Sequence, residues 1–495
     1  MIMTEPASLG ISRALQAIRS GALSPTALVQ EMLDRISRFD GRVRSFVHLD
    51  PAGALAAARR IEAAAATGGA LSGIPLGLKD LFDTADMPTT GCSLLFEDRR
   101  PERDALSVAR LRSSGAVILG KLAAWECGMG GTSFTSPWPP TRNPWDLGRD
   151  PGGSSSGSAA AVAAGFCLGA TGSDTGGSIR EPASWCGIAG LKPTYGLVDV
   201  SGVMAASHSL DHVGPMARDS RDCAVMLDVM AGKERDACFS KTIDQGVAGL
   251  RIAVVDLDHE DQLHLDEAIA GGVDRAAALL TQRGAVVTRV RLPKLGLFSA
   301  VCTVLASVEG FALHRTHLTA SSSLYDPLTL RRLLVGGRVS ANDHRAAERV
   351  REILILRVAE AMASLDLVVM PTTRVTAPVL GGFDSHGGHP SLTRPWNVTG
   401  YPALSIRLGF DGAGLPVGLQ IAGHPFTDAL VLRAGHALES GLDDRCRWPD
   451  LEAAAAPPPP PDPAIEVSDE RALEALADIT ERAAELVRSA ARSGG

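Results

Sequence analysis

Residues 150–194 read DPGGSSSGSAAAVAAGFCLGATGSDTGGSIREPASWCGIAGLKPT, and glycine and serine are denser here than an ordinary core segment allows. A flexible Gly/Ser linker would be polar throughout, whereas residues 159–169 form an apolar run. We therefore expect a buried helix with a tight loop at each end, the first of which begins like an N-cap cluster. In the second loop, residues 172–178, Gly176 and Gly177 directly precede Ser178. Glycine lets backbone N–H groups approach a ligand closely, so the loop predicts an oxyanion hole beside Ser178.

Lysine is rare in this chain, which has 48 Lys and Arg residues in total but lysine only at positions 79, 121, 192, 233, 241 and 294. Lys79 lies in GIPLGLKDLFDT, after an apolar stretch that predicts a buried strand. A buried lysine can lose its charge and act as a base, which arginine cannot. Lys79 is therefore a candidate catalytic base.

Several long segments resemble the amidase signature family of serine hydrolases. They are GIPLGLKD, TRNPW, GGSSSGSAAAVAAG, SDTGGSIR and GLKPT, followed downstream by SLDHVGPMARD, DLVVMPTT, NVTGYPALSIRLGF and GLPVGLQIAGHPF. The order is kept over about residues 10–440, so chance is a poor explanation. The resemblance implies one large α/β catalytic domain over residues 1–450, with a mixed β-sheet covered by helices on both faces.

The same resemblance implies a catalytic lysine, a serine preceded by a cis peptide bond, and a serine nucleophile. On this sequence they are Lys79, Ser154 with the cis bond at Gly153–Ser154, and Ser178. Ser155 is expected to support the nucleophile by a hydrogen bond. The oxyanion-hole N–H groups would belong to Thr175, Gly176, Gly177 and Ser178. No metal and no cofactor is implied.

These residue types suit amide hydrolysis, which needs a nucleophile, a base, a proton for the leaving nitrogen and donors for the oxyanion. Ser178 would attack the carboxamide. Neutral Lys79 would accept its proton through the Ser154 hydroxyl, which later returns a proton to the leaving amine. Asp174 and Arg180 flank the nucleophile loop, and we expect them to form a structural ion pair.

The loop over residues 125–145 contains Trp125, Met129, Phe134 and Trp138, and its irregularity follows from four prolines. In the family this loop lines the acyl pocket, so all four are candidate specificity residues, with Met129 and Trp138 foremost. They would suit an aromatic or aliphatic acyl group. Coverage of the core by aromatic side chains is an equally good explanation.

Two other catalytic arrangements fit local patterns. GSSSG at residues 153–157 matches G-x-S-x-G, which would make Ser155 a nucleophile, but no strand is predicted before it. His208, Asp211 and His212 could instead complete a Ser-His-Asp triad with Ser178. A structural role for the SLDHVGP segment is favoured because the family has it without catalytic duty.

Composition excludes several classes of protein. The chain has 495 residues, 45% hydrophobic and 21% charged, with a net charge of −8, so no basic footprint for nucleic acid or anionic membrane exists. Eight scattered cysteines without a C-x-x-C pair favour a reduced, cytoplasmic protein. We expect neither a signal peptide nor a membrane span. The pairs His314/His317 and His386/His389 lack a recognisable metal motif.

The C-terminal part departs from the family pattern. Residues 453–463, AAAAPPPPPDP, predict a stiff proline-rich linker, and residues 464–495 a helical tail capped by Ser468. An apolar stripe runs along the tail through Leu473, Leu476, Ile479, Leu486 and Val487. The stripe would pack on its own domain or on a second copy of the chain, which leaves a homodimer open.

The sequence therefore predicts an amidase that hydrolyses a small-molecule carboxamide. Two alternatives remain. The glutaminase subunit of a tRNA-dependent amidotransferase carries the same motifs, so the triad does not separate the two. A catalytically silent binding protein on this fold is the other, and an intact Lys79, Ser154 and Ser178 argue against it.

Overall fold

The computed structural model describes residues 9–64, 68–233, 239–258, 260, 263–382, 391–454 and 470–493. Several helices begin where a capping side chain stands before a proline. Ser24 accepts a hydrogen bond from the N–H of Ala27 at 3.0 Å, and Pro25 opens α2 (Pro25–Val43). Asp50 caps α3 (Pro51–Ala63) in the same way. The cap satisfies a free N–H group, and proline at the first helical position needs no acceptor.

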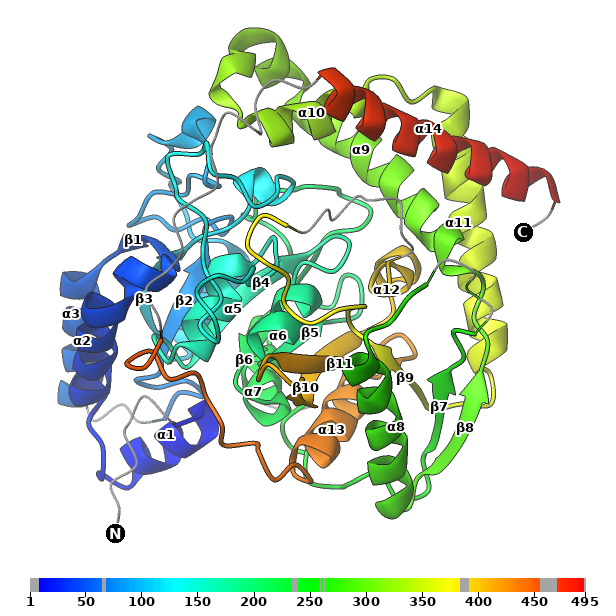
Figure 1. The fold of residues 1–495 in the computed structure, drawn as a ribbon. Coiled ribbons are helices and arrows are strands. Elements are labelled where there is room, and N and C mark those ends of the chain that lie inside the picture. Colours follow the sequence, from blue (N-terminus) through cyan, green and yellow to red (C-terminus); the bar gives the residue numbers. More distant parts are fainter. Residues whose placement is uncertain are drawn as a thin grey trace.

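The described part of the chain forms one 11-stranded mixed sheet in the order β1-β3-β2-β4-β6-β5-β10-β11-β9-β7-β8 (Figure 1). Strands pair in parallel where β2 meets β3 and β4 and where β7 meets β8 and β9, and antiparallel elsewhere. The strands are β1 (Phe46–Leu49), β2 (Pro75–Lys79), β3 (Val117–Leu122), β4 (Gly169–Asp174), β5 (Ala189–Lys192), β6 (His212–Ala217), β7 (Arg251–Val255), β8 (Val286–Val290), β9 (Leu367–Pro371), β10 (Ala403–Phe410) and β11 (Pro416–Gly423).

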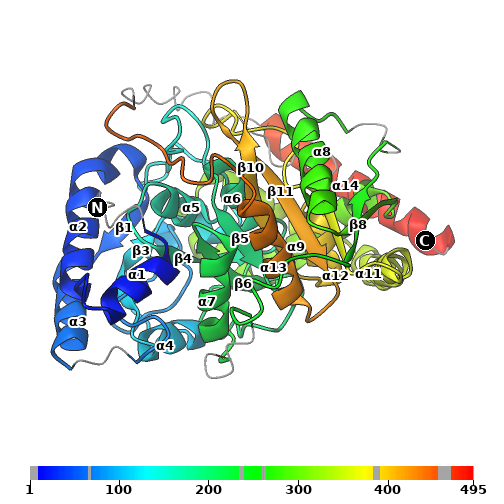
Figure 2. The same cartoon turned by 90° about the horizontal axis from the view of Figure 1, so that it is seen from below.

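Helices cover both faces of this sheet (Figure 2). On β11 the Gln420 side chain accepts a hydrogen bond from Arg180 of α6, whereas the neighbouring Ile421 lies opposite Leu404, which packs against α13. Because successive side chains of a strand point to opposite faces, α6 and α13 lie on opposite sides. The helices around the sheet are α1 (Ile11–Arg19), α2, α3, α4 (Leu106–Ser113), α5 (Ser156–Ala163), α6 (Arg180–Cys186), α7 (Ser220–Met230), α8 (Glu267–Gln282), α12 (Arg394–Thr399) and α13 (Asp428–Glu439), with short 3₁₀ turns at Leu94–Phe96, Glu126–Gly128 and Ser322–Leu324.

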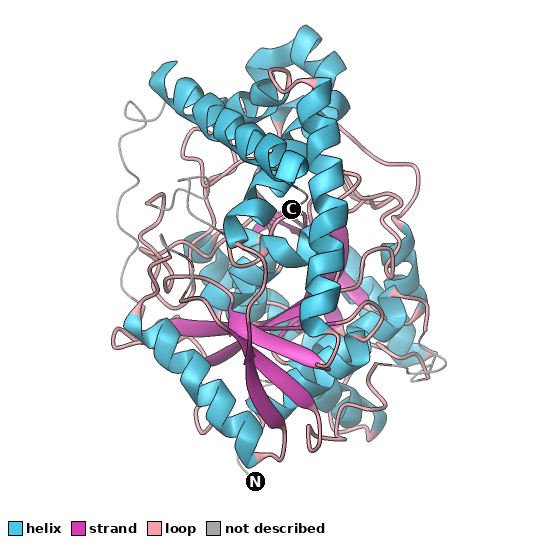
Figure 3. Ribbon diagram, turned by 90° about the vertical axis from the view of Figure 1, so that its right-hand side faces the viewer, coloured by secondary structure: helices cyan, strands magenta, loops and turns pink. Residues whose placement is uncertain are grey.

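A layer of long helices stands beyond the sheet (Figure 3). It consists of α9 (Leu295–Ser321), α10 (Pro327–Gly336), α11 (Ala341–Met362) and α14 (Glu470–Ser493). By length and composition α9 is apolar enough to cross a membrane, but it packs against α10, α11, α12 and α14. Its apolar character therefore fits a core helix of this layer.

Most elements agree with the sequence patterns. The buried strand ending at Lys79 and the buried helix after the first Gly/Ser loop are confirmed. The second Gly/Ser loop is shorter than predicted, because residues 169–174 form β4. A Cβ at Gly169 would lie 2.5 Å from the sulfur of Met226, so this central strand needs small residues.

The C-terminal tail forms α14, which packs on its own chain against α9, α10 and α11. Its buried side chains include Thr480, Ala483, Ala484, Val487 and Ala490. Leu486 was expected in the apolar stripe but is 43% exposed, because the helix presents its alanine-rich face to the domain. The side chains of Leu473 and Leu476, Ser468 and most of the proline-rich linker lie outside the described residues.

Candidate active site

Lys79 ends β2 with its side chain completely buried. Its Nζ atom donates to three serine hydroxyls: Ser154 Oγ at 2.8 Å, Ser155 Oγ at 2.9 Å and Ser173 Oγ at 2.9 Å. An ammonium group donates three hydrogen bonds, and three hydroxyl oxygens accept them. A neutral amine keeps two N–H donors and offers its lone pair to the third hydroxyl, so the same geometry suits both protonation states.

Burial lowers the pKa of Lys79 to about 7, although the carboxylates of Asp174 and Asp211 oppose this by favouring the charged amine. Removal from water disfavours the ammonium form, and the surrounding hydroxyl groups carry no charge to restore it. A substantial fraction of Lys79 is therefore neutral near pH 7, which is the state that accepts a proton.

The loop before α5 brings Ser154 and Ser155 to Lys79. The peptide bond Gly153–Ser154 is cis, as expected. The N–H of Ser155 donates to the carbonyl oxygen of Ser178 at 3.2 Å, which ties this loop to the nucleophile loop. The Ser155 hydroxyl contacts Lys79 and the carbonyl of Ser173, so Ser155 supports the nucleophile through its backbone.

Ser178 is only partly buried and lines a cavity of about 160 Å³. Ser154 and Ser155 are 1% and 0% exposed, and neither is among the described residues that line this cavity. Of these three serines, Ser178 is the one that lines the cavity, where a substrate could reach it. The burial of Ser155 argues against a nucleophilic role for it in a G-x-S-x-G site.

Asp174 organises the nucleophile loop. Its carboxylate accepts hydrogen bonds from the N–H groups of Gly177 at 2.7 Å and Ile179 at 3.2 Å, and from the guanidinium of Arg180 at 3.0 and 3.1 Å. Both side chains of the Asp174–Arg180 pair are fully buried. Arg180 and these hydrogen bonds hold the pKa of Asp174 well below its usual range against the effect of burial. The expected structural ion pair is confirmed.

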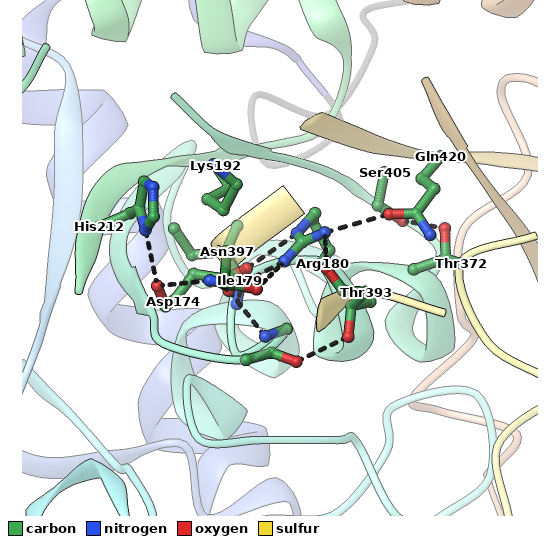
Figure 4. Close-up of polar contacts among 12 residues, drawn as sticks. Asp174, Ile179, Arg180, Lys192, His212, Thr372, Thr393, Asn397, Ser405 and Gln420 are labelled. Carbon is green, nitrogen blue, oxygen red and sulfur yellow. Dashed lines mark hydrogen bonds and ion pairs between the residues drawn. The ribbon is translucent and has the colours of Figure 1, made fainter. Parts of the chain in front are cut away.

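Amide side chains surround this ion pair (Figure 4). Asn397 donates to Asp174 Oδ1 at 2.8 Å and accepts from Arg180 Nη2 at 2.7 Å. Gln420 accepts from Arg180 Nη1 at 3.1 Å. Thr393 donates to the carbonyl of Gly176 at 2.6 Å, so the start of α12 is bonded directly to the nucleophile loop. Buried polar groups that are fully paired in this way rigidify a site.

The oxyanion-hole donors differ from the expectation at one residue. The Gly177 N–H donates to Asp174 Oδ1 at 2.7 Å, so it stabilises the loop. Within the described part of the chain, the N–H groups of Thr175, Gly176 and Ser178 donate to no protein acceptor. Thr175, Gly176 and Gly177 line the Ser178 cavity, and Thr175, Gly176 and Ser178 are the donors this geometry leaves for a ligand.

The alternative histidine triad has no support in the geometry. His212 is buried, and its Nδ1 lies 2.6 Å from the carbonyl of Leu210 and 3.3 Å from that of Asp174. Burial holds its pKa well below the usual value. Asp211 accepts from the Thr175 hydroxyl at 2.6 Å and from the N–H groups of Ala206 and Ser207. His208 is exposed. These residues hold loops together.

Two of the predicted specificity residues, Trp125 and Met129, line the Ser178 cavity. A Cβ on Gly153 would lie 2.1 Å from the Trp125 ring, so glycine lets the ring lie directly on the catalytic loop. Trp138 instead lines a neighbouring cavity of about 40 Å³, together with Glu126 and Asp326. Trp138 is thus not among the described residues that line the Ser178 cavity, and its pocket role stays a prediction. Phe134 packs against Gly381.

Charged side chains also reach the cavity wall, which the sequence did not indicate. Arg332 donates to the carbonyls of Met129 and Gly130, and Arg394 donates to Ser299 O at 3.2 Å and Thr303 Oγ1 at 3.1 Å. Burial raises the pKa of Glu181, a further wall residue, to about 8, and the Asp150 carboxylate adds to the effect. The carboxyl oxygen of Glu181 accepts a hydrogen bond from the N–H of Gly153 at 3.5 Å.

Sequence reasoning missed Ser173 and Asn397. The sequence did contain a signal for Ser173. Thr171 and Ser173 are two residues apart on β4, so their side chains lie on the same face of the sheet. Thr171 Oγ1 accepts from the N–H of Lys79 at 3.1 Å, and Ser173 from its Nζ. Asn397 lies 217 residues from Arg180 in sequence, and nothing local to it indicated the contact.

Other candidate groups have structural roles. Lys121 pairs with Asp80 at 3.1 Å, and Lys192 donates to Pro193 O at 3.0 Å, so neither contacts the serines. His314 bonds Tyr325 at 2.7 Å and His317 packs on Phe96. His386 and His389 lie outside the described residues. Within the described ranges, no group of three or more His, Cys, Asp or Glu side chains is placed to hold a metal ion.

Comparison with known proteins agrees with this geometry. The amidase family model matches residues 27–432. The chain is 37% identical to a glutamyl-tRNA(Gln) amidotransferase subunit of Roseiflexus castenholzii, over 91% of this chain and 99% of that protein. It is 36% identical to the putative amidase AmiD of Mycobacterium tuberculosis, over 87% and 94%. The structure of the peptide amidase from Stenotrophomonas maltophilia superposes with a TM-score of 0.77 at 31% identity, covering 91% of this chain and 99% of that one.

Proposed function

Because this chain belongs to the amidase signature family of hydrolases, we propose that it cleaves the C–N bond of a small carboxamide with Ser178 as the nucleophile. The observation that carries the proposal is the contact of 2.8 Å between Lys79 Nζ and Ser154 Oγ, together with the position of Ser178 in the wall of a cavity. A buried lysine that is hydrogen-bonded to three hydroxyls and has a pKa of about 7 is suited to act as a base.

The acylation step follows from these groups. Neutral Lys79 takes the proton of Ser154, Ser154 takes the proton of Ser178, and Ser178 Oγ forms a bond to the carbonyl carbon. The negative charge moves to the carbonyl oxygen, where the N–H groups of Thr175, Gly176 and Ser178 stabilise it. As the C–N bond breaks, the relay delivers a proton to the leaving nitrogen. Ammonia or an amine departs, and an acyl-enzyme remains.

Deacylation uses the same groups in the same order. A water molecule replaces the amine, and its proton passes through Ser154 to Lys79 as its oxygen attacks the ester. The tetrahedral species collapses to the free acid, and Ser178 regains a proton from the relay. The protein returns to its starting protonation state, so the balance needs only amide and water.

The cavity supports a compact substrate. Its volume of about 160 Å³ is on the scale of one small ring. Trp125, Met129 and Val335 provide apolar wall, and the guanidinium groups of Arg332 and Arg394 are bonded to backbone and hydroxyl oxygens. We therefore infer an acyl group that is aromatic or short and aliphatic.

The alternative function is the glutaminase subunit of a tRNA-dependent amidotransferase. The identity of 37% over 99% of such a protein favours it, and two arginines in the cavity wall would suit a substrate that carries a carboxylate. In that case the chain would need partner subunits, and glutamine would be the amide that it hydrolyses.

The test is hydrolysis of aryl, aliphatic and glutamine amides, and of the matching esters, by the purified chain alone. Ser178→Ala is the control. We expect turnover of compact amides that disappears in the variant. A folded chain that turns over glutamine only with co-purified subunits would support the alternative, and turnover retained by Ser178→Ala would refute the assignment of the nucleophile.

A further inference from the structure

The C-terminal helix α14 reaches the Ser178 cavity. Ile479 and Thr480 line this cavity together with Ser178 itself. The match to the family model ends at residue 432, so α14 lies outside the matched region. In Figure 1 the helix, coloured red, lies across α9 and α11 at the far side of the molecule from α1.

A face of small side chains seats α14 closely on the domain. Thr480, Ala483, Ala484, Val487 and Ala490 recur at helical spacing and are all buried. The alanines and Val487 belong to the same apolar cluster as the inner faces of α9 and α11. Arg488 forms an ion pair with Asp343 in the first turn of α11. This contact area and the ion pair hold Ile479 at a defined place on the cavity wall.

The neighbouring wall residues belong to the same packed unit. Cys302 and Ala306 come from α9, and Arg332 and Val335 from α10, while α14 contacts both helices. Met129 packs on α9 as well, since a Cβ on Gly310 would lie 2.3 Å from its terminal methyl carbon. Ser178 and Gly176, by contrast, belong to the loop between β4 and α6. The cavity is therefore lined on one hand by this loop and on the other by residues of α9, α10 and α14, which we call the helical wall.

We propose that α14 is a specificity element, in which Ile479 limits the size of the substrate group that lies against the helical wall. This inference rests on the proposed amidase function and assigns the selection of compact amides to the tail. Ile479 is half-buried and has a branched, inflexible side chain. A shorter side chain at this position lengthens the cavity, and a longer one shortens it.

The test compares Ile479→Ala and Ile479→Trp with the wild type on two series of amides, one of increasing acyl length and one of increasing amine length. Leu486→Ala is the matched control, because Leu486 is on the same helix and 43% exposed. We expect Ile479→Ala to raise kcat/KM for the longest amide relative to the shortest by about tenfold, the scale of one or two methylenes in an apolar pocket. Ile479→Trp should lower the same ratio, and Leu486→Ala should leave it within about twofold.

A shift of the ratio in either series supports the proposal and identifies which side of the amide faces α14. Ratios that stay equal to the wild type in both series, with wild-type turnover intact, overturn the proposal and leave the proposed function standing. A wild-type chain that hydrolyses no amide overturns the proposed function, and this inference with it. Circular dichroism confirms that each variant is folded, and Ile479→Val, with its smaller expected shift, replaces any variant that is not.

Discussion

The Nζ atom of Lys79 and the Oγ atom of Ser154 lie 2.8 Å apart in a region where both side chains are at most 1% exposed. At this distance a proton passes from the hydroxyl to a neutral amine without a bridging water. The relationship joins the end of a strand to a loop 75 residues later. Its chemistry depends on the protonation state of Lys79, which makes it testable by pH.

The acylation rate should rise with pH through about 7. Lys79 has a pKa of about 7, and only its neutral form accepts the proton of Ser154. We expect kcat/KM for a compact amide to increase about tenfold per pH unit below this value and to level above it. In Lys79→Ala, kcat/KM should not show this rise with pH. A flat profile between pH 6 and 8 in the wild type would contradict the assignment.

The free energy of unfolding should also depend on pH because of Lys79. The folded pKa of Lys79 is about 7 against an ordinary value of 10.5, so between these values the unfolded chain binds more protons and stability rises with pH. From pH 7 to 9 the wild type should gain about 2 kcal/mol of unfolding free energy from this residue. Lys79→Met should lack the gain, as urea denaturation at both pH values would show. Equal pH dependence in the two proteins would refute the shifted pKa.

Arg180→Ala should destabilise the fold strongly. The substitution leaves the buried carboxylate of Asp174 without its cation, and removing one partner of a buried ion pair costs about 3–5 kcal/mol. The denaturation midpoint in urea measures the loss. Arg251→Ala, which removes the exposed Arg251–Asp366 pair, is the control and should leave the midpoint nearly unchanged. Similar midpoints for the two variants would argue against the role of Arg180.

Gly177→Ala should inactivate the enzyme without unfolding it. Gly177 has a φ of 134°, and a Cβ there would lie 2.4 Å from Thr393 Oγ1, so the nucleophile loop must shift. We expect kcat to fall by at least about a hundredfold, the scale of a lost oxyanion donor. Gly246→Ala is the control, since Gly246 has a φ of 68° but no atom near the added Cβ. Wild-type kcat in Gly177→Ala would show that the loop position is not critical.

Met129→Ala should alter the preference among acyl groups, whereas Trp138→Ala should not. Met129 lines the Ser178 cavity and Trp138 lines a separate one. Relative kcat/KM values for aryl, alkyl and polar amides test the difference. If Trp138→Ala altered the preference and Met129→Ala did not, Trp138 would be a residue of the substrate pocket and the prediction would be wrong.

Much of the fold was accessible from the sequence because its signals are local. An apolar run predicted β2 up to Lys79, and a serine cluster before an apolar run predicted the start of α5. β4 was harder to predict, because the sequence GATGSD has poor strand propensity. Its glycines are needed because the neighbouring side chains leave no space for a larger residue. Likewise, Asp222 caps α1 from 211 residues away by accepting from Ile11 N at 2.7 Å, which no local pattern indicates.

By itself, the sequence determined the chemical types at the site: a rare lysine after a buried strand and two Gly/Ser loops on either side of a buried helix. Only the tertiary structure decided that Ser173 completes the lysine's partners, that the Gly177 N–H serves Asp174, that Trp138 faces another cavity and that Ile479 reaches the substrate wall. The physical reason is the separation along the chain over which each effect acts. Propensity and capping act over a few residues, whereas the direction of a side chain and the lining of a cavity depend on how segments hundreds of residues apart pack together.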